Sequence, residues 1–303
     1  MNKRIFKAAV IGLGRMGARH INACINSNEI DLIAINDNNK ELEAKISHEI
    51  NVNVTKNVNS LIGLIDLAII ATPTEFHSEV ANPLLSNGIH CLIEKPITLE
   101  NKDAVKLNNI ARKNNSILAV GHSERFNPVI KQLKDSIQSL PKPASIIVKR
   151  LNKLTNFNYT DDVILDLVIH DIDLLNFLCI ADILKIKKIF HDVKNDITQE
   201  CVFDISFVNN TNVQFFASRR NSTRERSLTL KYNKFHMIAD LIDFKLLKVS
   251  NEVSINIPVK VYDALEMQLS HFIKKIKDTE TLIASGDEAL AALRVTNKIR
   301  QLF

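Results

Sequence analysis

Residues 6–17, FKAAVIGLGRMG, decide the fold of the first half of this chain. The apolar run 6–13 predicts a buried parallel strand that ends at glycines, and helical spacing follows over 15–26. Such glycines permit a sharp turn, a close approach of backbone to a diphosphate, and tight packing of helix on strand. A tight turn without a ligand is the alternative. We expect a dinucleotide cofactor to be bound at Gly12, Gly14, Arg15, Met16 and Gly17.

The same strand–helix alternation continues to about residue 121. Strands are predicted at 30–35, 67–71, 89–93 and 117–121, and helices at 40–50, 77–86 and 99–114. Strands separated by single helices indicate right-handed crossovers. The fold class is therefore α/β, with an N-terminal doubly wound (Rossmann) parallel sheet in residues 1–124.

The pattern changes near residue 125 and predicts a second domain, 125–303, of mostly antiparallel open sheet. We expect helices at 128–137 and 162–179, and strands at 145–151, 201–208, 213–217, 227–232, 235–239 and 252–257. Phe203, Ile205 and Phe207 would share one strand face, with Asp204 and Ser206 on the other. The final helices, 262–277 and 287–301, can pack back on the first domain.

Composition limits the class of protein. The chain has 303 residues, a net charge of +5 and a pI of about 8.9, without a dense basic block, so nucleic-acid binding is not indicated. No apolar stretch reaches the roughly 20 residues of a membrane helix, and no signal segment is seen, so we expect a cytoplasmic protein. The cysteines are scattered and predict buried reduced thiols: Cys24, Cys91, Cys179 and Cys201.

A second group of residues follows the strand ends, where ligands bind in doubly wound sheets. Asp37 ends the second strand, and a carboxylate there would bind ribose hydroxyls and repel a 2′-phosphate, which favours NAD over NADP. Thr72, Pro73 and His77 would line the cofactor, although His77 could be an ordinary capping or surface histidine.

Lys95 directly follows another buried strand, in Glu94-Lys95-Pro96. A lysine there would meet both the nicotinamide ring and a substrate hydroxyl. A lowered pKa would make it a proton acceptor. The alternative is a solvated lysine at a strand end.

The helix predicted at 162–179 carries polar residues at i, i+4 and i+7: Asp166, His170 and Asp173. Asp166 could orient His170, which can move a proton near neutral pH. Asp161 and Asp162 suit the helix N-terminus. A structural network and a metal site are the competing interpretations, and metal is disfavoured because no second His/Cys cluster stands out.

In this ordered set of motifs the chain resembles the Gfo/Idh/MocA family of oxidoreductases. The motifs are the glycine loop, Ala71-Thr72-Pro73 with His77, Glu94-Lys95-Pro96, and Asp166-x-x-x-His170-Asp171. The resemblance implies that Lys95, Asp166 and His170 are catalytic, and that Glu94 and Lys95 touch the nicotinamide ribose.

Residues 120–128 and 166–173 are similar to the branch that oxidises the 3-hydroxyl of UDP-N-acetylglucosamine with NAD, before an aminotransferase installs a 3-amino group in lipid A or polysaccharide synthesis. This resemblance implies substrate contacts from Lys95, Arg125, Asn127, Asp166 and His170, and a homodimer or homotetramer formed through the C-terminal sheet. A substrate diphosphate could be bound by four arginines: Arg219, Arg220, Arg224 and Arg226. The alternative is that they belong to a solvated strand edge or to an oligomerisation face.

Two other functions stay open. One is a dehydrogenase of another substrate, such as an inositol, an aldose or a nucleotide-linked uronic acid. The other is a dinucleotide-binding sensor without turnover, which would not need Lys95 together with Asp166 and His170.

Overall fold

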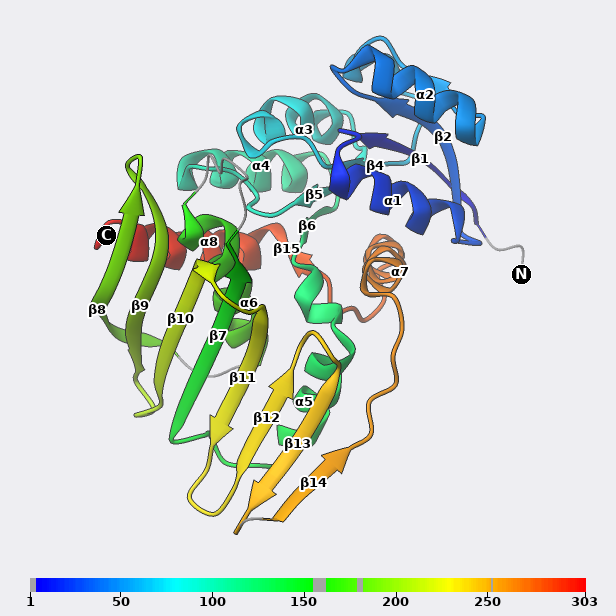
Figure 1. The fold of residues 1–303 in the computed structure, drawn as a ribbon. Coiled ribbons are helices and arrows are strands. Elements are labelled where there is room, and N and C mark those ends of the chain that lie inside the picture. The colour runs from blue at the N-terminus through cyan, green and yellow to red at the C-terminus, as the bar shows by residue number, and fades with distance from the viewer. Residues whose placement is uncertain (1–3, 155–161, 179–181, 252) are drawn as a thin grey trace. The chain divides into compact units, whose positions relative to one another are not determined.

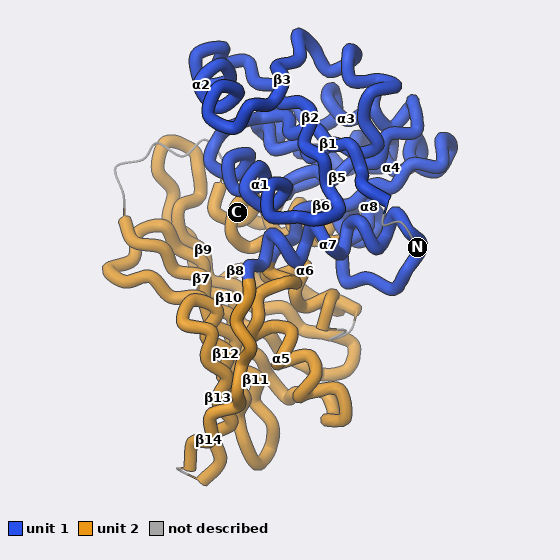
Figure 2. The backbone as a smooth tube through the Cα atoms, turned by 90° about the vertical axis from the view of Figure 1, so that its right-hand side faces the viewer, with its two compact units in different colours: residues 1–123, 263–291 blue, residues 124–262, 292–303 orange. Residues whose placement is uncertain are grey.

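The computed structural model describes residues 4–154, 162–178, 182–251 and 253–303 (Figure 1). The chain forms two compact units, which are described separately (Figure 2). Unit 1 comprises residues 1–123 and 263–291, and unit 2 comprises residues 124–262 and 292–303. The second segment of unit 1, residues 263–291, therefore lies between the two segments of unit 2 in the sequence.

Unit 1 contains a seven-stranded sheet in the order β15-β6-β5-β4-β1-β2-β3. All neighbours are parallel except β15, which runs antiparallel to β6. The predicted doubly wound sheet is confirmed, and β3 and β15 are additions too short to leave a sequence pattern. The strands are β1 (Phe6–Ile11), β2 (Ile30–Asn36), β3 (Asn53–Val54), β4 (Leu67–Ile70), β5 (His90–Glu94), β6 (Leu118–Gly121) and β15 (Ala284–Ser285).

The helices of unit 1 follow the predicted ranges closely, with ends set by local polar groups. For example, the Asn39 side chain accepts the Leu42 N–H at 3.1 Å, which caps the helix that begins at Lys40. The α-helices are α1 (Arg15–Ile25), α2 (Lys40–Ile50), α3 (His77–Ser86), α4 (Asn101–Lys113), α7 (Ala264–Ile276) and the first part of α8 (Gly286–Arg300). Two 3₁₀ turns, η1 (Val58–Leu61) and η2 (Thr74–Phe76), precede α3.

Unit 2 contains an eight-stranded sheet in the order β14-β13-β12-β11-β7-β10-β9-β8. Among the described strands of this sheet, only β7 and β10 are parallel neighbours, so the predicted mostly antiparallel sheet is confirmed. The strands are β7 (Ser145–Lys153), β8 (Ile183–Lys194), β9 (Ile197–Phe207), β10 (Asn212–Asn221), β11 (Glu225–Lys231), β12 (His236–Asp240), β13 (Lys245–Ser250) and β14 (Val253–Ile257).

The two faces of this sheet differ in burial. Phe203 and Phe215 stack with ring centroids 4.6 Å apart on the buried face, as the alternation along β9 predicts. The opposite face is partly exposed. It carries a cross-strand row in direct register: Ile147, Thr229, Ile238 and Leu247.

The helical segments of unit 2 include one correction. The single helix predicted over 162–179 is instead a π-helical turn, η4 (Ile164–Val168), followed by α6 (Ile169–Phe177). Asp162 accepts the Leu165 N–H at 2.7 Å at the start, whereas Asp161 and Cys179 lie outside the described residues. A π turn has more residues per turn than an α-helix, so a stripe counted at α-helical spacing does not carry through it. The other helical segments are η3 (Ser123–Phe126), α5 (Pro128–Ile137) and the end of α8.

Three cysteines that the structure describes, Cys24, Cys91 and Cys201, are buried free thiols, as predicted. Burial raises the pKa of the Cys24 thiol to about 12. No helix in the described part of the chain combines the length and the apolar character needed to cross a membrane.

Candidate functional site

The glycine loop of unit 1 has the geometry of a diphosphate cradle. Gly12 has φ +88°, and a Cβ on it would lie 2.5 Å from the Ala71 carbonyl carbon. A Cβ on Gly17 would lie 1.9 Å from the Gly12 oxygen, because α1 packs directly on the loop. In contrast, a Cβ on Gly14 would meet no protein atom within 4 Å. Gly14 also begins α1 without any side-chain cap, so the helix N-terminus faces open space that suits an anion.

A cleft of about 990 Å³ lies beside this loop. It brings together Gly12, Gly14, Asp37, Thr72 and Pro73, five of the residues expected to bind the cofactor. The chain after β2 and the segment at η1 supply much of the remaining wall, which includes Asn36, Asn38, Asn39, Lys40, Lys56, Asn57, Val58 and Asn59. A cleft of this size, with an open glycine backbone and a carboxylate, fits a dinucleotide.

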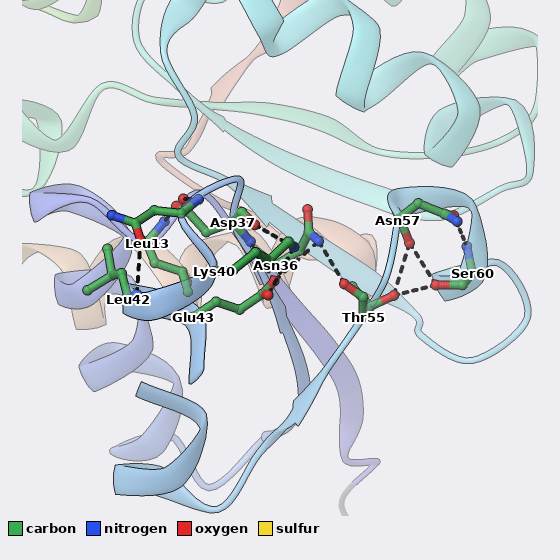
Figure 3. Close-up of polar contacts among 10 residues, drawn as sticks. Leu13, Asn36, Asp37, Lys40, Leu42, Glu43, Thr55, Asn57 and Ser60 are labelled. Atoms are coloured by element: carbon green, nitrogen blue, oxygen red, sulfur yellow. Dashed lines mark hydrogen bonds and ion pairs between the residues drawn. The ribbon is translucent and has the colours of Figure 1, made fainter. Parts of the chain in front are cut away.

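Asp37 is tied to the glycine loop (Figure 3). Its Oδ2 accepts the Leu13 N–H at 2.6 Å, and its Oδ1 accepts the Asn39 N–H at 2.7 Å. The carboxylate is partly exposed in the cleft wall and has further lone pairs for ligand hydroxyls. The sequence-based placement of Asp37 beside the loop agrees with this geometry.

His77 is neither a surface residue nor part of the cleft wall, which corrects both interpretations. It is 1% exposed. Its Nδ1 lies 2.9 Å from the Pro96 oxygen, and its Nε2 lies 3.0 Å from the Thr72 oxygen. Burial, opposed by these carbonyls, lowers the pKa of His77. The ring therefore connects the loop after β4 to the loop after β5. These contacts help to fix the backbone at Thr72 and next to Lys95.

Glu94 also points inward, so its carboxylate is not placed as a ribose ligand. It is 8% exposed, its Oε1 lies 2.8 Å from His20 Nε2, and its Oε2 accepts the Lys95 N–H at 3.2 Å. Burial opposes ionisation, but the hydrogen bond and charge of His20 hold the pKa of Glu94 below its usual value. A Cβ on Gly121 would lie 3.0 Å from Glu94 Oε1, so a larger residue there would require the carboxylate to shift.

His20 was missed as a functional candidate because it belongs to none of the motifs that the sequence displays. Its partner is a strand-end carboxylate 74 residues later, which helical spacing cannot show. Through Glu94 it fixes the backbone that precedes the partly buried Lys95.

In unit 2, Asp166 and His170 stand out by exposure. Among residues 163–175 they alone are partly exposed, and every other residue is buried. Asp166 Oδ2 pairs with Arg219 Nη2 at 2.7 Å. Arg219 is 2% exposed, so it is neither a solvated strand edge nor an available phosphate ligand. Asp173 is buried too, so the expected three-residue stripe reduces to Asp166 and His170.

Arginine–aspartate pairs anchor α6. Arg125 holds Asp173 through two hydrogen bonds of 2.8 and 2.7 Å, and Arg150 holds Asp171 through two of the same lengths. All four side chains are at most 3% exposed. These bidentate pairs fix α6, and hence the position of His170. The expected contact of Arg125 with substrate is therefore replaced by a structural role.

Asn127 likewise has a structural role in place of the expected substrate contact. Its Oδ1 accepts the Val129 N–H at 3.1 Å and caps α5, and its Nδ2 donates to the Leu241 oxygen at 3.0 Å. Arg226 pairs with Glu124 at 3.2 Å, and Arg220 pairs with Asp192.

No group of three or more His, Cys, Asp or Glu that could hold a metal ion occurs in the ranges that the structure describes.

Comparison with known proteins identifies the N-terminal fold. Residues 6–122 match the family model described as "Oxidoreductase family, NAD-binding Rossmann fold". Over this region the chain is similar to the Gfo/Idh/MocA family. The glycine loop and Asp37 lie within it, and NAD is the cofactor that the cleft is built to hold.

Curated proteins with similar sequences match different shares of the chain. The chain is 33% identical over 176 residues to UDP-N-acetylglucosamine 3-dehydrogenase of Acidithiobacillus ferrooxidans, covering 58% of this chain and 55% of that protein. It is 27% identical over 136 residues to rhizopine catabolism protein MocA of Rhizobium meliloti, covering 44% and 43%. In these alignments the chain spans about half the length of the curated relatives it matches.

Similarity to solved structures covers more of the chain. The solved structure of the Acidithiobacillus ferrooxidans UDP-N-acetylglucosamine 3-dehydrogenase matches with a TM-score of 0.91 and 25% identity, over 98% of this chain and 97% of that one. A dehydrogenase from Clostridium difficile matches with a TM-score of 0.87 and 20% identity, over 98% and 99%. The latter likeness concerns the fold alone.

Proposed function

We propose that this protein is an NAD-dependent dehydrogenase that oxidises a secondary hydroxyl of a nucleotide sugar, the 3-hydroxyl of UDP-N-acetylglucosamine. The observation that carries the proposal is the partial exposure of Asp166 and His170 on an otherwise buried helical segment. A dehydrogenase needs an accessible proton acceptor, and a structural network does not. The similarity to a UDP-N-acetylglucosamine 3-dehydrogenase, in sequence and over nearly the whole structure, supports the substrate.

The proposed roles follow from the surroundings of each residue. When bound, NAD accepts the hydride. Lys95 or His170 takes the hydroxyl proton, and Asp166, held by the buried Arg219, supplies a fixed negative charge that favours the required orientation of His170. Arg125 and Asn127 are not included among the proposed substrate ligands because their polar atoms serve unit 2 itself.

The cofactor preference is proposed from Asp37. Its carboxylate is held at the glycine loop in the cleft wall, where it can accept hydrogen bonds from ribose hydroxyls and repel a 2′-phosphate. NAD is therefore the expected cofactor, and NADP should bind more weakly.

The direct test incubates the protein with UDP-N-acetylglucosamine and NAD, follows NADH absorbance, and looks for a 3-keto product by mass spectrometry. An aminotransferase with an amino donor is included in a parallel reaction, since it removes the ketone. Inositols, aldoses and nucleotide-linked uronic acids form the comparison panel. Faster NADH formation with one of these would replace the proposed substrate, whereas NADH binding without turnover of any sugar would favour the sensor.

The mechanism is tested by Lys95→Ala and His170→Ala. Each change should lower turnover by about 10²-fold or more because a proton acceptor is lost, while NAD binding is kept. Asn176→Ala is the matched control, since Asn176 is exposed on the same helix as His170 and should not affect turnover. Full turnover in both variants would contradict the proposed roles.

A further inference from the structure

A buried carboxylate lies behind the cofactor cleft. Glu43, on α2, is 2% exposed, and its side chain is directed toward the chain that follows β2 (Figure 3). Its Oε1 accepts the Asp37 N–H at 2.9 Å, and its Oε2 pairs with Lys40 Nζ at 3.0 Å. A buried carboxylate is costly unless it is paired, and these two contacts satisfy it with groups of the cleft wall.

The first contact fixes where Asp37 lies. With its N–H held by Glu43, the Asp37 carboxylate is directed to the Leu13 N–H at 2.6 Å. Glu43 thus sets the backbone from which Asp37 reaches the cofactor.

The second contact determines what Lys40 can do. Lys40 lines the cleft beside Asp37, and its side chain is 63% exposed. Its ammonium donates to Glu43 Oε2 at 3.0 Å and to the Asp37 carbonyl oxygen at 2.8 Å. An ammonium at this position would otherwise be a ligand for a phosphate on the adenosine ribose.

We propose that Glu43 is a positioning residue for cofactor selectivity. It holds Asp37 in the orientation that accepts ribose hydroxyls, and it holds Lys40 in an ion pair that withdraws the ammonium from a 2′-phosphate. The inference rests on the NAD-binding part of the proposed function and not on the identity of the sugar.

The test titrates the full-length protein with NADH and with NADPH, without sugar, and follows nucleotide fluorescence. Glu43→Gln keeps an oxygen for the Asp37 N–H but removes the charge that holds Lys40. The dissociation constant of the Glu43→Gln variant for NADPH should fall about fivefold, which corresponds to the energy expected for one partly exposed ion pair. Its dissociation constant for NADH should change less than about twofold. In Lys40→Gln/Glu43→Gln the gain for NADPH should disappear.

Glu41→Gln is the matched control, because Glu41 is exposed in the same helical turn and carries the same charge. It should leave both dissociation constants unchanged. An equal gain for NADPH in Glu41→Gln and Glu43→Gln would mean a general charge effect and overturn the proposal. The proposal would also be overturned if the dissociation constant for NADPH were unchanged in a Glu43→Gln variant whose melting temperature matches that of the wild type.

Lys40→Gln alone gives a measurement that does not depend on the folding of a Glu43 variant. If Glu43 withdraws Lys40 in the wild type, this change should leave the NADPH constant within about twofold. A weakening of fivefold or more would show that Lys40 is already available, and would overturn the proposal. Because no sugar is present, failure to oxidise UDP-N-acetylglucosamine bears on the substrate alone, whereas absence of NADH binding to the wild type would refute both.

Discussion

Gly14→Ala should separate cofactor binding from stability in unit 1. Gly14 has φ −62° and ψ −167°, which alanine also adopts, and its added Cβ would meet no protein atom within 4 Å. The free energy of unfolding should therefore change by less than about 0.5 kcal/mol. The methyl group would instead occupy the space in front of the α1 N-terminus, where we place the diphosphate.

The expected loss is that of one charge-assisted hydrogen bond to the diphosphate, about 1.5–3 kcal/mol, or roughly a 10- to 100-fold higher dissociation constant for NADH. The assay is fluorescence titration with NADH, beside urea unfolding of the same sample. Gly17→Ala is the contrasting variant. Its Cβ would lie 1.9 Å from the Gly12 oxygen, so it should also lose about 1–3 kcal/mol of stability. Wild-type NADH affinity in Gly14→Ala would refute the placement of the diphosphate.

Three other changes test unit 2 and the acid response. Arg150→Ala should cost about 3–5 kcal/mol in urea unfolding, because it leaves the buried Asp171 without its bidentate partner, whereas Arg224→Ala, at an exposed position, should cost little; equal costs would contradict this. Burial holds the pKa of His271 at about 4, so the stability that its neutral ring contributes should be present above pH 6.5 and lost as the pH falls toward 4. In His271→Gln the melting temperature should therefore depend less steeply on pH between 6.5 and 4. The same slope as in the wild type would argue against this. We expect a homodimer or homotetramer formed through the unit 2 sheet, and Ile147→Lys on its partly exposed face should lower the mass measured by light scattering; a monomeric wild type would refute this.

The sequence was most informative where function depends on local geometry. Glycine spacing predicted the loop at Gly12, Gly14 and Gly17, and the end of the second strand predicted where Asp37 would lie. Both features involve residues within one βαβ unit, for which strand and helix periods largely determine position.

It was least informative where contacts join distant segments. The Asp166–Arg219 pair spans 53 residues, a separation that helical spacing could not reveal. Periodicity also could not reveal the π turn at Ile164–Val168, because apolar residues occupy both a π and an α turn. The resemblance implied that Arg125 contacts substrate, and the sequence could not show that Arg125 is held by Asp173, 48 residues away on α6.

The antiparallel pairing of β15 with β6 has a consequence for biosynthesis. Residues 263–291 supply unit 1 with an edge strand and with α7, so its first 123 residues are an incomplete fold whose β6 edge is unpaired. Such an edge is prone to pair with other chains. On the ribosome, unit 1 should not finish folding until residues 263–291 have emerged. A truncation after residue 123 should therefore aggregate, whereas joining residues 263–291 to it through a short linker should yield a soluble nucleotide-binding protein.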